Sequence, residues 1–356
     1  MGVHGRPDGD RAGRAPGRES AGADVSSGMR PAARRAATFD VCRPVAADHR
    51  VASTHGAHMQ VVDPHVHFWD ADALSYGWLD RAQPAFSGAV AELPRRYLPA
   101  DLRADAGADI DVLKVVHVEA IHDAWTTPSE VDWLQALADA PASGGMPDGI
   151  VAGVDLFAPD ACIRLAGAAA HPNVRGIRQV LNRHPDPWYN YVDVDYLAEP
   201  RWRENFGMLS EFGLSFDLQL YPAQVGAALA VIDAHPDTPV IVNHTGMFVD
   251  RSSVHGWREW RDGLRGLARR ANVTMKLSGL AMFDHRWTVE SFRPYVLEAI
   301  DVFGVARCMF ASNFPVDRLH AGYRALWHAY AAIVAGAGDD ERDALFVRNA
   351  LRIYRL

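Results

Sequence analysis

Long apolar runs and clustered cysteines are both missing from this sequence of 356 residues. No stretch approaches the roughly 20 apolar residues that a bilayer-spanning helix needs, so we expect no contact with a membrane. The three cysteines, Cys42, Cys162 and Cys308, stand far apart without CxxC spacing. This spacing excludes a zinc knuckle and a disulfide framework, and it fits a reducing, cytoplasmic setting. No GxGxxG or other glycine-rich phosphate loop is present, which argues against a dinucleotide-binding fold.

An excess of positive charge is also absent, since 36 Lys and Arg face 44 Asp and Glu and the net charge is -8. Such a balance argues against a nucleic-acid partner and suits an enzyme that acts on a small-molecule substrate. With 49% hydrophobic residues, the chain can bury a large core in one or two domains. The sequence leaves open whether the protein forms a homo-oligomer.

Residues 1–58 differ in composition from the rest, because they are rich in Ala, Arg, Gly and Asp and poor in large apolar side chains. Such a segment cannot bury enough apolar surface to offset the entropy of ordering, so we predict a disordered N-terminal extension. Its arginines are not followed by an apolar stretch, which argues against a secretory signal. Met59 directly precedes the first strand-like run and is a candidate translation start, which N-terminal sequencing of the native protein would test.

Eight short β-rich runs, most of them followed by a stretch with helical spacing of apolar residues, fill residues 59–356. The runs cover 60–66, 111–119, 149–156, 174–180, 214–220, 239–244, 273–278 and 307–312. Helical spacing is clearest over 131–140, 225–234, 257–270 and 294–303. Strand–helix alternation repeated eight times predicts one (β/α)8 TIM-barrel domain, with a doubly wound open sheet as the alternative.

Polar side chains gather at the ends of these runs, where the active site of such a barrel lies. The run VVDPHVHFWD places His65 and His67 one residue apart, and alternation puts Asp63 on the same face. In the fifth run, Asp217 and Gln219 point into the barrel, because the opposite face of that run is apolar. Further polar residues at strand ends are Glu119, Arg178, Tyr221, His244, Lys276 and Asn313.

Each of these residues also has a structural interpretation. Two histidines on one face are often a hydrogen-bonded core pair, and they become part of a metal or proton-transfer site only if His244 lies opposite them. Asp217 is either a base or a strut paired with Lys276 or Arg178. Arg178 is either that structural partner or a fork for a substrate carboxylate. The polar-aromatic loop 184–193 is a candidate lid over the barrel mouth.

Seven motifs, taken in order, are typical of one hydrolase family. They are DPHVHFWD, VRGIRQ, FDLQ, VNHTG, KLSGL, FASNFPVD and NALRIYRL, and they extend from about residue 60 to residue 356. The sequence resembles the amidohydrolase-related TIM-barrel hydrolases, in the branch of predicted metal-dependent hydrolases that contains lactonases of sugar lactones, muconolactones and pyrone dicarboxylates. The resemblance implies that water opens a small carboxylated or hydroxylated lactone. The alternatives are a metal-dependent decarboxylase of an unsaturated or aromatic acid and a non-catalytic ligand-binding relic.

The resemblance also implies roles for the residues at the strand ends. His65, His67 and His244 would be catalytic and, if a metal is bound, would be its ligands. Three imidazoles suit a zinc site with an open position for water, yet this branch includes members that work without metal, so both cases stay open. Glu119 or Asp217 would activate water. The substrate would be held by Arg178, Gln219, Tyr221, Lys276 and Asn313.

Asn313 departs from the family, which has an Asp in a GSDWP-like turn after the eighth strand. An amide cannot take a proton from water and is a poor anionic metal ligand. The base is therefore another carboxylate, namely Glu119, Asp217 or Asp317, or else a histidine, unless hydrolysis has been lost. Asp317 could equally serve as the N-cap of the last helix.

Overall fold

The computed structural model describes residues 58–123 and 129–356. Within them, eight parallel strands form one sheet in the order β1-β4-β5-β6-β7-β8-β9-β10. The strands are β1 (Met59–Val66), β4 (Ile110–Val118), β5 (Gly149–Gly153), β6 (Val174–Arg178), β7 (Ser215–Leu218), β8 (Val240–Val242), β9 (Val273–Leu277) and β10 (Cys308–Phe310). The His67 amide donates to the Phe314 carbonyl (2.7 Å) and the Asn313 amide to the His65 carbonyl (2.9 Å). These bonds join β1 to the segment that follows β10 and close the barrel.

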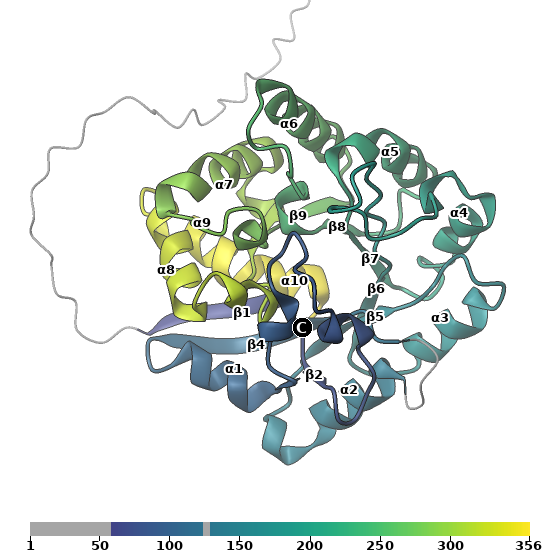
Figure 1. Ribbon diagram of the computed structural model, residues 1–356, viewed down its shortest axis with the longest axis horizontal. Helices are drawn as coiled ribbons and strands as arrows, with labels where there is room; N and C mark the ends of the chain where they lie inside the picture. The colour runs from purple at the N-terminus through teal and green to yellow at the C-terminus, as the bar shows by residue number, and fades with distance from the viewer. Residues whose placement is uncertain (1–57, 124–128) are drawn as a thin grey trace, which may run out of the picture. The chain divides into compact units, whose positions relative to one another are not determined.

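Helices alternate with the strands and ring the barrel, as Figure 1 shows. They are α1 (Pro99–Ala106), α2 (Glu130–Asp139), α3 (Ala161–Ala169), α4 (Pro200–Gly207), α5 (Val225–Ala234), α6 (Val254–Ala268), α7 (Val289–Phe303) and α8 (Tyr323–Ile333). The predicted (β/α)8 barrel is confirmed. The open doubly wound alternative is wrong, because the first and last strand segments are hydrogen-bonded to each other.

Alternation of side chains along the strands separates the barrel interior from the helix layer. One buried cluster contains Val62, Val116, Val151, Ile241 and Met309, with Ala350 and Tyr354 from the C-terminal helix. Residues of the other parity, such as Phe216 and Leu218, pack in the large cluster beneath the helices. Asp217, between these two, therefore points inward as the sequence predicts.

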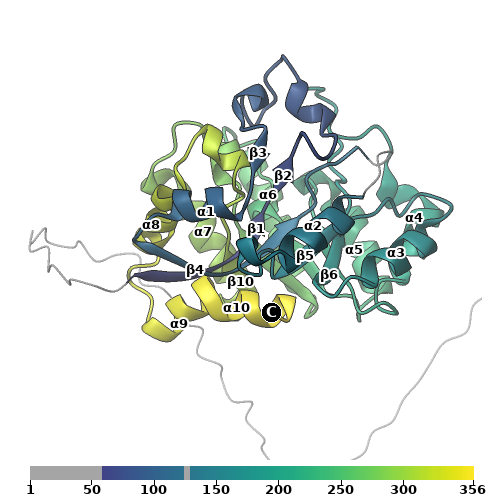
Figure 2. The ribbon, with the colours of Figure 1, turned by 90° about the horizontal axis from the view of Figure 1, so that it is seen from below.

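The two ends of the barrel are covered differently. Figure 2 shows α9 (Asp339–Asp343) and α10 (Asn349–Tyr354) across one end, and the ribbon of β2 (Trp69–Asp70) and β3 (Arg96–Tyr97) at the other. The C-terminal ends of the eight strands open toward the β2–β3 end. Polar groups that follow the strands are thus gathered opposite α10.

The first strand does not keep strict alternation, which corrects one prediction. Its pairing with β4 shifts register between Asp63 and Val66. Asp63 therefore turns toward α8, where its carboxylate accepts a hydrogen bond from the Tyr323 hydroxyl (3.0 Å), and it does not share the site of His65. A bulge of this kind re-aims side chains without any mark in the hydrophobic pattern.

The predicted disordered extension, residues 1–58, lies outside the described residues except for His58. In the described ranges, no helix has the length and apolar character that crossing a bilayer requires.

Candidate active site

Three imidazole rings meet at the C-terminal ends of β1 and β8. The ring centroid of His65 lies 4.9 Å from that of His67 and 4.5 Å from that of His244, and all three side chains are buried. His244 adopts a left-handed backbone with φ of 52° just after β8. Gly279 leaves room for this ring, because a Cβ at that position would lie 2.5 Å from His244 Nδ1. Segments far apart in the chain thus supply one compact cluster.

All three imidazoles are neutral at pH 7. Burial lowers the pKa of His65 well below its ordinary value, and the nearby Lys276 charge adds to the effect. Burial likewise lowers the pKa of His67 and of His244, with Arg178 as the next cause in each case. A neutral imidazole carries one N–H donor and one lone pair, so this cluster can both donate and accept protons.

The hydrogen bonds of His67 fix its tautomer. Its Nδ1 lies 2.7 Å from the Val118 carbonyl oxygen, which can only accept, so Nδ1 carries the proton and Nε2 carries the lone pair. The Oδ1 atom of Asn313 lies 3.3 Å from that Nε2. Asn313 is oriented by donating from Nδ2 to Asp317 Oδ1 (2.7 Å). Two acceptor atoms therefore lie side by side, one on each residue.

Asp317 is a fully buried carboxyl group without a charged partner among the described residues. Burial raises its pKa to about 8, and its Oδ2 atom has no hydrogen-bond partner in the described part of the chain. The predicted N-cap role is wrong, since α8 begins at Tyr323 with Gly322 as its N-cap. Asp317 instead holds the Asn313 amide, as described above.

Arg178 binds two other predicted site residues. Its Nε donates to Glu119 Oε1 (2.6 Å), its Nη1 to Gln219 Oε1 (2.8 Å) and its Nη2 to the Glu119 carbonyl (2.5 Å). Glu119 Oε2 accepts from the Ile121 amide (2.8 Å). Burial raises the pKa of Glu119, yet both of its oxygens are engaged. These contacts favour a structural role for all three side chains, and direct contact with a substrate stays a prediction.

Asp217 and Lys276 form a second buried ion pair. Lys276 Nζ lies 2.5 Å from Asp217 Oδ1 and 3.4 Å from His65 Nδ1. Asp217 also accepts from Asn243 Nδ2 (2.9 Å) and from the Tyr354 hydroxyl, which lies 2.9 Å from each carboxylate oxygen. A carboxylate with so many donors matches the predicted strut better than the predicted base. Lys276 is thus engaged within the protein, and its contact with a substrate stays a prediction.

Aromatic and methionine side chains from the loops after the strands pack together, and Met282 and His244 both lie close to Gly279. Phe86, Tyr221, Met247 and Met282 form one buried cluster. The Tyr221 hydroxyl donates to the Tyr189 carbonyl (2.6 Å), which ties the loop 184–193 to this cluster. A lid function for that loop stays a prediction.

Two stacked histidines fasten the loop that carries Phe86. His285 Nε2 lies 2.9 Å from the Phe86 carbonyl oxygen, and His320 Nε2 lies 2.8 Å from the Ser87 carbonyl oxygen. The two rings are nearly parallel, with centroids 3.7 Å apart. These bonds tie the Phe86 loop to the segments that carry His285 and His320.

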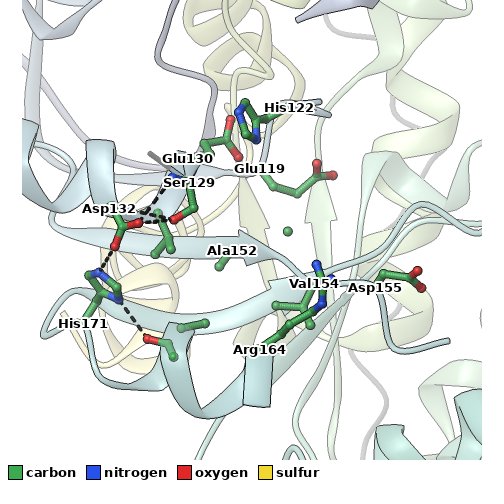
Figure 3. Close-up of a pocket in the computed structure, with 14 residues that line it drawn as sticks. Glu119, His122, Ser129, Glu130, Asp132, Ala152, Val154, Asp155, Arg164 and His171 are labelled. Carbon is green, nitrogen blue, oxygen red and sulfur yellow. Dashed lines mark hydrogen bonds and ion pairs between the residues drawn. The ribbon is translucent and has the colours of Figure 1, made fainter. Parts of the chain in front are cut away.

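A cavity of about 370 Å³ lies beside the cluster, between α2 and α3 (Figure 3). Its lining within the described residues includes Glu119 but none of the three clustered histidines. Asp132 Oδ1 and His171 Nε2 are hydrogen-bonded on its wall at 3.0 Å. Among the described lining residues, Glu119 is the one that also belongs to the predicted site.

The donor set does not fit a preformed metal centre. Within residues 58–123 and 129–356, no group of three or more His, Cys, Asp or Glu side chains is arranged to hold an ion. A metal on His65 Nε2 would leave the proton on Nδ1, where it would face the Lys276 ammonium instead of an acceptor. Asn313 supplies an amide where a carboxylate ligand would be needed.

Comparison with known proteins identifies the family. The Amidohydrolase family model matches residues 62–356. The chain belongs to the amidohydrolase family. The resemblance seen in the sequence motifs is thereby confirmed, and so is the assignment of the chain to an enzyme family of hydrolases.

Among its relatives, the Sinorhizobium fredii protein named "Uncharacterized protein y4mH" is 42% identical over 298 residues, which cover 83% of this amidohydrolase and 98% of that protein. An L-fucono-1,5-lactonase of Burkholderia ambifaria is 27% identical over 308 residues, covering 83% and 95% of the two chains. A crystal structure of a Burkholderia multivorans amidohydrolase with bound Zn has a TM-score of 0.68 at 24% identity, covering 83% and 99%. This last likeness supports the barrel fold.

Two residues of the site were not singled out from the sequence. Asn243 stands beside His244 in VNHTG, and inward parity with Ile241 was the signal that could have found it. Tyr354 lies in the last helix, and nothing in its spacing indicates that it enters the barrel.

Proposed function

We propose that this amidohydrolase opens a small lactone by adding water, with the three neutral histidines as its reacting groups. The observation that carries the proposal is the buried His65 ring between His67 and His244, whose Nε2 atom has no hydrogen-bond partner among the described residues. A buried polar atom without a partner is costly, so its retention points to a bound group. The name of the B. ambifaria relative, an L-fucono-1,5-lactonase, supports a lactone as that group.

In this mechanism His67 is the general base. The Nε2 lone pair of His67 and Oδ1 of Asn313, 3.3 Å apart, are two acceptors that can share one water molecule. That water directs one of its lone pairs at the carbonyl carbon of the lactone. His67 takes a proton as the new C–O bond forms. Asn313 thus orients the water without having to accept a proton. Hydrolysis in this scheme therefore does not need the Asp that the family has at this position.

His65 stabilises the charge that develops on the carbonyl oxygen. An N–H at Nε2 stabilises this negative charge more strongly in a buried position without bulk water than it would in bulk solvent. The tetrahedral intermediate then collapses, the ring C–O bond breaks, and the leaving oxygen takes a proton from the His67 imidazolium. The product is the open hydroxy acid, so atoms and charge balance. The His244 ring, 4.5 Å from that of His65, is the third neutral imidazole that can donate or accept a hydrogen bond in the site.

Every proton in this scheme is carried by side chains of this chain, because the donor set does not fit a metal. A Zn²⁺ ion on His65, His67 and His244 would lower the pKa of a bound water, which is the alternative that an assay must exclude.

The test is a panel of sugar lactones, muconolactone and 2-pyrone-4,6-dicarboxylate, assayed by acid release with and without a chelator. We expect turnover of at least one lactone, unchanged after metal removal verified by elemental analysis. His67→Gln should lower it by about 10²- to 10⁴-fold, whereas His328→Gln, a change at an exposed histidine paired with Asp109, should leave it unchanged. Absence of turnover by metal-replete protein would refute the proposal. Restoration by Zn²⁺ alone would leave lactone hydrolysis standing and overturn the metal-free route. Release of CO2 would identify a decarboxylase instead.

A further inference from the structure

We propose that Tyr354 and Asp217 are positioning residues, which hold Lys276 against His65 Nδ1 and thereby keep the proton of His65 on Nε2. The importance of that proton rests on the proposed function, whereas the tautomer itself can be measured without any substrate. The arrangement gives the C-terminal helix, at the far end of the barrel, a part in preparing the site.

The first step concerns Lys276 and His65. Lys276 is fully buried, and its Nζ lies 3.4 Å from His65 Nδ1. The Asp217 carboxylate, 2.5 Å from Nζ, favours the ammonium form of Lys276. An ammonium group has only N–H donors, so the ring nitrogen that faces it must offer a lone pair. In a neutral imidazole the proton then resides on the other nitrogen, Nε2.

The second step concerns what holds Lys276 in place. Its Nζ lies 2.5 Å from Asp217 Oδ1, and both side chains have no exposed surface. The ammonium also lies 4.9 Å from the ring centroid of Tyr354, within range of a cation–π contact. Without Asp217, the buried charge would lose its ion-pair partner, only the more distant Asp63 carboxylate would still favour it, and the pKa of Lys276 would fall.

The third step concerns Asp217 itself. The Tyr354 hydroxyl lies 2.9 Å from both carboxylate oxygens, and Asn243 Nδ2 lies 2.9 Å from Oδ1. These donors belong to α10 and to the residue that follows β8, so hydrogen bonds from two different elements fix the carboxylate. Loss of the Tyr354 hydroxyl would let Asp217 rotate away from Lys276. Lys276 would then move away from His65 Nδ1, and the tautomer of His65 would change although no residue at the mouth had been altered.

Imidazole ¹⁵N NMR of the full chain at pH 7 reads the tautomer directly, with the His65 signals assigned by comparison with His65→Gln. We expect the Nε2–H tautomer in the wild type and loss of that single tautomer in Lys276→Met. Tyr354→Phe, which removes only the hydroxyl, should give a mixture of tautomers. Tyr330→Phe is the matched control, because Tyr330 is also fully buried but donates to the Ala311 carbonyl.

The second readout is the steady-state kinetics of a lactone that the protein hydrolyses. Lys276→Met should lower kcat by about 10²-fold or more, the usual contribution of a correctly protonated catalytic group, with KM little changed. Tyr354→Phe should lower kcat less, and Tyr330→Phe should not.

A wild-type His65 protonated on Nδ1 would overturn the proposal, and so would an unchanged tautomer in both Lys276→Met and Tyr354→Phe. If Lys276→Met does not fold, the wild-type and Tyr354→Phe spectra decide. The expected spectra without turnover of any lactone would refute the proposed function and leave this inference intact.

Discussion

Asp317 offers a sharp test, because a neutral carboxyl group in a folded protein makes stability depend on pH. In the unfolded chain this group has its ordinary pKa of 3.8, and in the fold burial raises the pKa to about 8. Between these values the folded state binds a proton that the unfolded state lacks. Unfolding therefore releases a proton, and the free energy of unfolding falls as pH rises, by about 1.4 kcal/mol per pH unit from this group alone.

The variant Asp317→Asn removes the titration and keeps an oxygen that can accept from Asn313. Over the three pH units from pH 5 to pH 8, the free energy of unfolding of the wild type should fall by about 4 kcal/mol through this group. The variant should therefore gain about 4 kcal/mol relative to the wild type over this range. The gain should be largest at pH 8 and above and should shrink toward pH 4. Because other groups titrate equally in both proteins, they cancel in this difference.

The assay is urea unfolding of both proteins at pH 5, 6, 7 and 8, followed by tryptophan fluorescence. Asp340→Asn, a change at a fully exposed carboxylate, is the control and should show no such trend. A difference between Asp317→Asn and the wild type that does not change with pH would refute the reasoning. Lactone hydrolysis should survive Asp317→Asn, since Asn313 keeps its hydrogen-bond partner, and should fall in Asp317→Leu.

Three further predictions concern activity and access. His67→Gln should reduce lactone hydrolysis by about 10²- to 10⁴-fold with the fold intact, as measured by kcat and circular dichroism, because the general base is removed. Burial holds the pKa of His67 well below 6.5, so kcat/KM should stay level as pH falls through 6.5 and decline only at more acid pH; a decline centred at 6.5 would mean that a solvated histidine is the base. His320→Ala removes the bond to the Ser87 carbonyl, so hydrogen exchange at the amides around Phe86 should quicken relative to wild type, and unchanged exchange would show that this bond does not hold the Phe86 loop.

Much of the fold follows from local patterns. The apolar spacing over 225–234 coincides with α5 (Val225–Ala234), and the run at 273–278 with β9 (Val273–Leu277). Predicted runs overshoot the strands at their C-terminal ends, as with 149–156 against β5 (Gly149–Gly153). There the backbone leaves the sheet to build the mouth, and hydrophobic periodicity does not register that change.

The sequence by itself determined the eightfold strand–helix alternation, the family, and the histidines that stand at the strand ends, because these depend on spacing along the chain and on recognisable motifs. Only the tertiary structure decided which polar side chains pair with one another. Arg178 binds Glu119 and Gln219, and Lys276 binds Asp217, so residues expected to meet a substrate instead meet each other. Such pairings depend on distances across the barrel between distant segments, and on the cost of burying each charge without a partner. Neither the distances nor the burial costs can be calculated from the sequence alone.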